Sequence, residues 1–288
     1  MKIAVVTDST AYLTDEEVKK YNIHVVSIPV IFDGKTYHEG VDITTEQFYD
    51  KLRASKELPK TSQPAMGEMI NMYNELAKEG YDTVISIHLA STISGLMNSL
   101  HTIAASETNI KVIPYDSKIT VKLMGYLAME AGKMALEGKS VDVILARLDD
   151  LRSTIDEVFI VNDLKNLVKG GRLSNASAVI GTMLRIKPLL TFDDKTNEIV
   201  AYGKVRSVKK AYLKAEETFK KAQDNADFPY RLIVIDGNDP KENDKWTADL
   251  KQKFPDTTID QSYFGPVIGT HLGEKAMALG WIKDFDKA

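Results

Sequence analysis

The run Lys169–Ser174 holds the residues of this chain best suited to binding an anion. Gly170 and Gly171 remove side-chain bulk and permit backbone angles that other residues avoid. Arg172 follows with a planar fork of N–H donors that suits a carboxylate or a phosphate, and Ser174 is a typical N-cap for a following helix. The run predicts a loop in which an anion approaches an arginine, although a helix C-cap followed by a solvated arginine gives the same pattern.

Hydroxyl side chains gather where predicted strands end and predicted helices begin. Thr61 and Ser62 precede a helix that starts near Pro64, and Ser94 with Gly95 follows a strand and opens another helix. The carboxyl ends of parallel strands face the ligand crevice of an α/β sheet. N–H groups at the amino end of a helix attract anions. These residues are therefore candidates for an anion site, although each hydroxyl could equally be an ordinary helix cap.

A loop bracketed by Gly265 and Gly269 leads to His271 at a predicted helix start. A lone histidine there is either a ligand-binding group or a cap or surface residue. Standard cofactor motifs are absent from the sequence. Gly132–Ser140 has one residue too many for a Walker phosphate loop and lies at a helix end. No G-x-G-x-x-G follows a strand, and no histidine spacing suggests zinc, so we expect no cofactor and no metal.

Composition narrows the class of protein. The chain has 288 residues, 43% hydrophobic and 27% charged, with a net charge of −4 and no cysteine. The absence of cysteine excludes disulfides and thiolate metal sites. The negative net charge gives no indication of a basic surface that would bind nucleic acid. There is no signal-peptide pattern and no apolar run long enough to span a bilayer. We therefore expect a cytoplasmic protein without stable membrane insertion.

Apolar runs alternate with helical patterns, which predicts an α/β fold. The pattern of predicted strands and helices changes near residue 155, so we expect two domains. The first, 1–155, should have a parallel sheet and a small β-ribbon near 24–42. The second, 156–288, contains a predicted hairpin at 187–206 and should therefore have a mixed sheet. A final helix is expected from about Leu272.

In their order along the chain, these motifs resemble the DegV family over essentially the whole sequence. The matching segments are Thr7–Thr10, Glu39–Thr44, Thr61–Pro64, Ser91–Gly95, Asp116–Ser117, Lys169–Ser174, Lys187–Leu190 and Gly265–His271. The resemblance implies a cytoplasmic fatty-acid-binding protein of two α/β domains. The acyl chain would lie in a tunnel, with the carboxyl group near the interdomain cleft.

The resemblance also implies a partner, namely a separate ATP-binding subunit related to dihydroxyacetone kinases. That subunit would phosphorylate the bound carboxylate to an acyl-phosphate, so the chain itself would supply no catalytic residue. The family's hydroxyls that contact the carboxylate match Thr61 and Ser94, and the other head-group positions match the remaining candidates. The implied fatty-acid site is Thr61, Ser62, Ser94, Gly95, Arg172 and His271.

Two segments depart from the family pattern. Leu96-Met97 stands where the family usually has Thr-Tyr, which would reshape the tunnel wall. Gly273-Glu274-Lys275 replaces the usual Gly-Pro-Gly after His271, which affects the local loop and any docking surface formed there. Val179–Leu184 is apolar enough to line the tunnel, but packed core is the safer interpretation.

Other functions remain open from the residues alone. One is a free-standing serine hydrolase acting on acyl esters, with Ser94, His271 and an acid such as Asp116, although no G-x-S-x-G elbow is present. Another is a regulator that senses lipid. For a fatty acid, burial of some fifteen methylenes would supply roughly 12 kcal/mol at most, at about 0.8 kcal/mol per CH₂. The tail should therefore dominate affinity, and the polar residues should set orientation.

Overall fold

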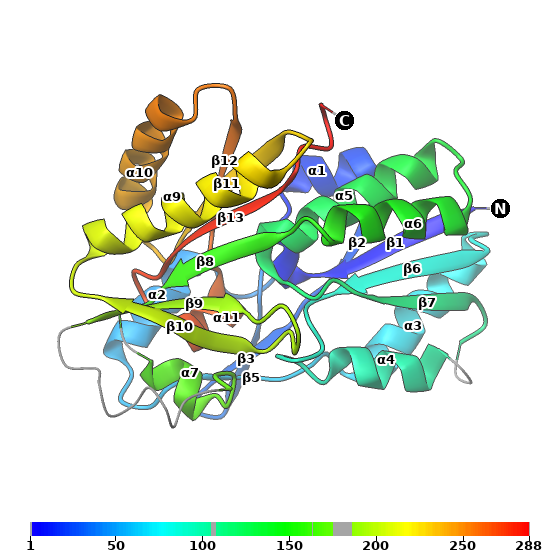
Figure 1. Ribbon diagram of the computed structural model, residues 1–288. Coiled ribbons are helices and arrows are strands. Elements are labelled where there is room, and N and C mark those ends of the chain that lie inside the picture. The colour runs from blue at the N-terminus through cyan, green and yellow to red at the C-terminus, as the bar shows by residue number, and fades with distance from the viewer. Residues whose placement is uncertain (1, 105–107, 163, 175–185, 288) are drawn as a thin grey trace. The chain divides into compact units, whose positions relative to one another are not determined.

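The computed structural model describes residues 2–104, 108–162, 164–174 and 186–287 (Figure 1). Contacts divide the chain into two compact units. Unit 1 comprises Met1–Ile43 and Thr61–Ser153, and unit 2 comprises Thr44–Lys60 and Thr154–Ala288. The division after Ser153 lies beside the predicted boundary at residue 155, but the segment Thr44–Lys60 joins the unit formed by the later part of the chain. That the two units are independent domains remains a prediction.

Unit 1 is built on a four-stranded sheet in the order β2-β1-β6-β7, and all of its pairings are parallel. The expected parallel α/β architecture is thus confirmed. Every residue of β1 and β6 is buried, which explains their nearly continuous apolar sequences. The strands are β1 (Ile3–Asp8), β2 (Ile23–Val26), β6 (Thr83–His88) and β7 (Lys111–Asp116).

Helices cover both faces of this sheet. Figure 1 shows α5 and α6 on one side and α3 and α4 on the other. The helices of unit 1 are η1 (Ser9–Ala11), α1 (Asp15–Tyr21), α3 (Met66–Lys78), α4 (Leu96–Ala104), α5 (Val121–Leu136) and α6 (Val141–Arg152). Helix α1 begins with a capping box between Thr14 and Glu17, whose T-x-x-E spacing is typical of a helix start.

A separate three-stranded sheet, in the order β4-β3-β5, contains β3 (Pro29–Phe32), β4 (Lys35–His38) and β5 (Lys60–Thr61). Asp33 and Gly34 form its hairpin turn with φ of 48° and 77°, the positive values that a two-residue turn of this kind requires. The short strand β5 delivers Thr61 to this sheet. The ribbon therefore positions one of the predicted site residues.

Unit 2 has a six-stranded mixed sheet in the order β10-β9-β8-β13-β11-β12. Only the β11–β12 pair is parallel among these described strands. The strands are β8 (Asp156–Ile160), β9 (Lys187–Phe192), β10 (Ile199–Val205), β11 (Tyr230–Asp236), β12 (Thr258–Tyr263) and β13 (Met277–Lys283). The helices are α2 (Thr45–Ala54), α7 (Lys165–Lys169), α9 (Val208–Asn225), α10 (Pro240–Lys253) and α11 (Pro266–Leu272).

The expected final helix is wrong, because that segment is the strand β13 in the middle of the sheet. A central strand is covered on both faces, so its apolar residues form an unbroken run. Such a run has no period that separates it from a buried helix. Alternate residues of β13, including Leu279 and Trp281, face a core shared with α9 and α10.

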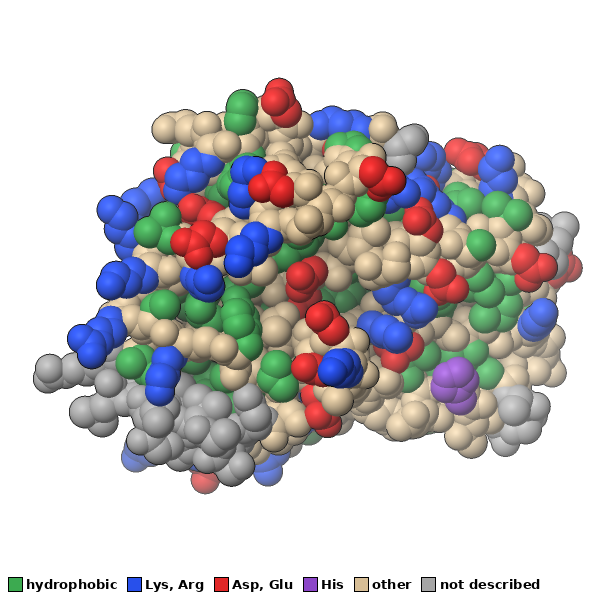
Figure 2. Space-filling model, viewed as in Figure 1, with side chains coloured by type: hydrophobic (Ala, Val, Ile, Leu, Met, Phe, Trp, Pro, Cys, Tyr) green, Lys and Arg blue, Asp and Glu red, His purple; other side chains and the backbone are tan. Residues whose placement is uncertain are grey.

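No helix in the described part of the chain is long and apolar enough to cross a membrane. On the face presented in Figure 2, acidic and basic side chains are interspersed over the surface.

Gly125 allows α5 to pack closely on the η1 segment, and its substitution should be costly. A Cβ there would lie 2.5 Å from the carbonyl oxygen of Ala11, which is backbone and cannot rotate away. We expect Gly125→Ala to lower the free energy of unfolding by about 1–3 kcal/mol. The matched control is Gly67→Ala in α3, where a Cβ meets nothing within 4 Å. Urea unfolding of both variants tests this, and equal stabilities would contradict the packing argument.

Candidate functional site

The segment after β5 presents two of the predicted hydroxyls. Thr61 is partly buried and Ser62 is exposed, and the Ser62 N–H donates to the carbonyl of Pro29 in β3 at 3.1 Å. The chain is therefore anchored to the ribbon by its backbone. Gln63 comes next, just before α3.

Ser94 and Gly95 lie at the amino end of α4. The Ser94 hydroxyl accepts from the N–H of Leu96 at 3.2 Å, so its oxygen caps the helix as one of the sequence interpretations proposed. A Cβ on Gly95 would lie 3.4 Å from the Gln63 side-chain oxygen. Gln63 is in turn hydrogen-bonded to Ser99 of α4 at 3.1 Å. The structure thus brings the segment after β5 and the start of α4 together, through a glutamine that sequence reasoning had not selected.

A buried chain of polar side chains holds the strand end from which the Ser94 loop leaves. Asp8 accepts from His88 Nδ1 at 2.9 Å and from the backbone N–H of Leu89 at 3.2 Å. His88 Nε2 lies 2.7 Å from the Ser86 hydroxyl, which lies 2.8 Å from the Tyr73 hydroxyl. These contacts link β1, β6 and α3 at the strand end that precedes the loop containing Ser94.

The order Ser86–His88–Asp8 has the connectivity of a hydrolase triad. Each of the three side chains is fully buried, at 0% exposure. The serine is also already engaged by Tyr73. A substrate therefore has no access to Ser86, and we assign the Ser86–His88–Asp8 chain of hydrogen bonds a structural role.

Asp116, the acid considered for a hydrolase, supports backbone in the structure. Its carboxylate accepts from the N–H of Lys118 at 2.8 Å and from the N–H of Ser91 at 3.4 Å. Because Ser91 starts the loop that ends at Gly95, this contact fixes the loop at its beginning.

In unit 2 the Gly170-Gly171 pair ends helix α7. The N–H of Gly171 donates to Val168 at 3.1 Å and the N–H of Arg172 donates to Leu167 at 3.0 Å, which is the Schellman pattern. Gly171 has φ of +69°, a value that favours glycine. The C-cap interpretation is therefore correct for the backbone.

The Arg172 side chain remains close to this cap. Its guanidinium donates to the carbonyl of Gly170, and the side chain is partly buried. Burial lowers the pKa of Arg172, but a guanidinium stays protonated in proteins. The loop thus holds one fixed positive charge.

His271, in α11, lies against the same glycine loop. A Cβ on Gly170 would lie 2.7 Å from His271 Nδ1, so the glycine is needed for the imidazole to approach. Asn166 of α7 donates to the carbonyl of Thr270 at 3.0 Å and links the two helices. Burial and, to a lesser degree, the Arg172 charge lower the pKa of His271 to about 4. At neutral pH the pair therefore combines a cationic arginine with a neutral imidazole.

The lowered pKa of His271 should make unit 2 less stable in mild acid. Between the unfolded value of 6.5 and the folded value of about 4, the unfolded chain binds a proton that the folded chain does not. Stability from this group is therefore present above pH 6.5 and lost as the pH falls toward 4. Between pH 7.5 and pH 5 the loss should be up to about 2 kcal/mol.

Denaturant unfolding of the wild type and of His271→Gln at these two pH values isolates this contribution. The variant should lose less stability than the wild type on acidification. An identical pH dependence in both proteins would show that His271 titrates normally.

Comparison with known proteins identifies the family to which this chain belongs. A family model described as "Uncharacterised protein, DegV family" matches residues 2–284. The chain belongs to the DegV family. Among its relatives, Protein DegV of Bacillus subtilis is 41% identical over 282 residues, covering 98% of this chain and 99% of the relative. A DegV domain-containing protein of Listeria monocytogenes is 45% identical over 280 residues, covering 97% and 98%.

Solved DegV structures share this architecture. The crystal structure of Bacillus subtilis DegV, described as a fatty acid binding protein, has a TM-score of 0.90 at 40% identity and covers 99% of this chain and 100% of its own. A fatty acid binding DegV family protein from Streptococcus agalactiae has a TM-score of 0.91 at 39% identity and covers 99% of both chains. A Thermus thermophilus DegV family protein, described by its fatty acid binding, has a TM-score of 0.87 at 28% identity and covers 98% and 100%.

Within this DegV chain the predicted head-group residues form two local groups. Thr61, Ser62, Ser94 and Gly95 belong to unit 1, and Arg172 and His271 belong to unit 2. The segment Val179–Leu184, considered for the tunnel wall, lies outside the described residues. In the described ranges, no three His, Cys, Asp or Glu side chains gather so that they could hold a metal ion.

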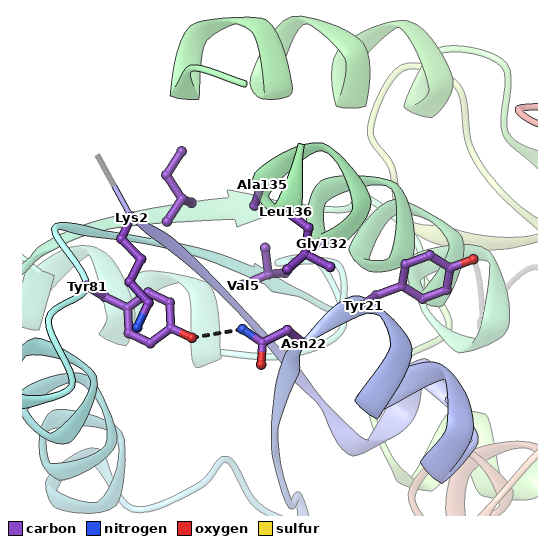
Figure 3. A pocket seen from close by; sticks show the side chains of 9 residues that line it. Lys2, Val5, Tyr21, Asn22, Tyr81, Gly132, Ala135 and Leu136 are labelled. Atoms are coloured by element: carbon purple, nitrogen blue, oxygen red, sulfur yellow. Dashed lines mark hydrogen bonds between the residues drawn. The ribbon is translucent and has the colours of Figure 1, made fainter. Parts of the chain in front are cut away.

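Unit 1 also contains a cavity of about 370 Å³ that involves none of these residues. It lies at the amino end of β1, the opposite end from Asp8, and is lined by Lys2, Tyr81 and Leu136 among others (Figure 3). The Lys2 ammonium sits 3.8 Å from the centre of the Tyr81 ring, and the Tyr81 hydroxyl accepts from Asn22 at 2.8 Å.

Proposed function

We propose that this protein binds one long-chain fatty acid and that its six candidate residues contact the carboxylate end. The observation that carries the proposal is the similarity, over 99% of the chain, to DegV proteins described as fatty acid binding. The chemistry of the two local groups fits the proposal. Hydroxyls at Thr61 and Ser94 and the N–H of Gly95 are donors suited to a carboxylate, and Arg172 supplies a charge of the opposite sign.

The geometry suggests a distinct role for each group. In unit 1 the Ser62 N–H fixes the segment of Thr61 to the ribbon, and the Ser94 hydroxyl accepts from the N–H of Leu96 at the start of α4, so local contacts position these hydroxyls to orient a carboxylate. In unit 2 the guanidinium of Arg172 lies beside a neutral imidazole. An arginine in that setting would offset the negative charge on the oxygens of the phosphoryl group as it is transferred to the carboxylate.

We further propose that the bound acid is presented to a separate ATP-binding subunit. Because the sequence contains no Walker phosphate loop, we assign ATP binding to another protein. In the reaction a carboxylate oxygen attacks the γ-phosphorus of ATP, the bond from that phosphorus to ADP breaks, and ADP leaves with its electron pair. The product is an acyl-phosphate.

Native mass spectrometry of the purified protein tests the binding proposal. We expect an added mass equal to one long-chain fatty acid, and after delipidation we expect uptake of one palmitate. A protein that purifies without lipid and takes up no palmitate would contradict the proposal. Turnover of an acyl ester that disappears in Ser94→Ala would instead establish the hydrolase alternative.

The hydroxyl donors should contribute measurably to affinity. Hydrogen bonds to a charged group contribute about 1.5–3 kcal/mol each, so Ser94→Ala and Thr61→Val should each weaken palmitate binding by roughly tenfold or more. The control is Ser140→Ala, which removes an exposed hydroxyl before α6 that makes no capping hydrogen bond. Calorimetry on delipidated protein measures all three. Unchanged affinity in both site variants would exclude these hydroxyls as carboxylate donors.

A further inference from the structure

Unit 2 contains a second cavity, of about 250 Å³, that the proposed fatty-acid function does not use. It lies past the carboxyl end of β8, where helices α9 and α10 begin, since Val208 and Glu242 from their first turns line it. Its residues Ile160 and Met277 belong to the core shared with α9 and α10. None of the six candidate head-group residues lines this cavity.

Tyr212 contributes a buried hydroxyl to the cavity. Its ring stacks on Trp246 at 3.9 Å between ring centres, and the residue is only 9% exposed. By distance and angle, no atom of the described residues forms a hydrogen bond with the hydroxyl, although the Glu242 carboxylate is near enough to act on it. Burial and the nearby Glu242 carboxylate raise the pKa of Tyr212, so the hydroxyl keeps its proton and is a donor. A buried donor without an acceptor costs free energy unless a ligand supplies one.

Charges of both signs line the same cavity without pairing with each other. Lys187 donates to the side-chain oxygen of Asn162 at 2.5 Å, and neither Lys187 nor Lys275 forms an ion pair with any acid that the structure describes. Asp239 and Glu242 also line the cavity, and Glu242 is paired with Lys245 outside the cavity lining at 3.5 Å. The cavity therefore presents both cationic and acidic side chains to a ligand.

We propose that this cavity binds a small zwitterion, a free α-amino acid with an apolar side chain. Its carboxylate would accept from Lys187 and the Tyr212 hydroxyl, and its ammonium group would donate to Glu242. The side chain would rest on Met277 and Val208. The volume lies below the usual range of about 300–1,000 Å³ for drug-sized ligands, so a small metabolite fits and a long acyl chain does not.

Calorimetric titration of the full chain with L-leucine, L-methionine and L-valine tests the proposal. We expect at least one of them to bind with a Kd of about 1 mM or tighter. For the best ligand, the analogue lacking the carboxylate (its amide) and the analogue lacking the ammonium group (for leucine, 4-methylpentanoate) should each bind at least tenfold more weakly. Absence of binding by all three amino acids, or equal binding by either analogue, would overturn the proposal.

Tyr212→Phe removes only the hydroxyl and should weaken amino-acid binding by about tenfold. Because no described residue meets hydrogen-bond criteria with that hydroxyl, the variant should melt at close to the wild-type temperature or higher. It should also bind palmitate normally, which separates this site from the proposed fatty-acid site. Tyr230→Phe, in the same core but outside the cavity lining, is the control. Wild-type amino-acid affinity in Tyr212→Phe would contradict the assignment.

Discussion

Shortening the fatty acid from sixteen carbons to ten should weaken its binding to this protein by at least a hundredfold. Each methylene removed from water contributes about 0.8 kcal/mol, so six of them contribute up to about 5 kcal/mol. Ordering the longer chain costs part of this, which leaves a decrease of at least a hundredfold, or about 2.7 kcal/mol. The head group is the same in every member of the series, so the trend isolates the tail.

Calorimetry on delipidated protein with acids of ten, twelve, fourteen and sixteen carbons measures this trend. Each acid must be kept below the concentration at which it forms micelles. A steady gain in affinity with each added pair of methylenes supports burial of the tail. Similar affinity across the series would mean that only the carboxylate is bound, and the lipid-carrier proposal would then fail.

Arg172→Ala should reduce acyl-phosphate formation by at least tenfold while weakening fatty-acid binding by no more than about threefold. We assign the holding of the bound carboxylate to the Thr61 and Ser94 hydroxyls and assign Arg172 to the phosphoryl-transfer step, so loss of Arg172 should change the affinity little. Loss of the cationic partner of the phosphoryl oxygens during transfer should cost about 1.5–3 kcal/mol, which corresponds to roughly ten- to hundredfold in rate. A coupled kinase assay beside palmitate calorimetry separates the two effects.

Two further variants make the Arg172 result specific. Arg172→Lys keeps the charge but loses the planar fork, so it should recover part of the activity. Arg206→Ala removes an exposed arginine elsewhere in unit 2 and should change neither quantity. Because the Arg172 side chain also holds the Gly170 carbonyl, thermal melting must show that Arg172→Ala is folded. Equal losses in binding and in phosphorylation would contradict the role assigned to this residue.

The parallel sheet of unit 1 was predictable because β1 and β6 are buried on both faces and read as short apolar runs. The same property misled the prediction for β13, where an equally buried run was taken for a helix. Membership of Thr44–Lys60 in unit 2 could not be predicted, because it depends on contacts such as the hydrogen bond from Tyr49 to the carbonyl of Phe264, 215 residues away.

For the candidate site, the ordered motifs located the glycine loop and the hydroxyls. The motifs did not reveal the residues that hold the candidate site in place. Gln63 stood inside one of the quoted motifs, but its contact with Ser99 depends on how two helices pack. His88 was invisible as a partner of Asp8, because 80 residues separate them and a histidine inside an apolar strand gives no periodic signal. Supporting residues of this kind become visible only when the sheet is assembled.

A crystal structure of this protein with palmitate bound tests the central claim most directly. We expect the carboxylate to lie within hydrogen-bonding distance of the Ser94 or Thr61 hydroxyl, with the alkyl chain enclosed by apolar side chains. A palmitate whose carboxylate points to solvent, or contacts none of the six candidate residues, would contradict the account.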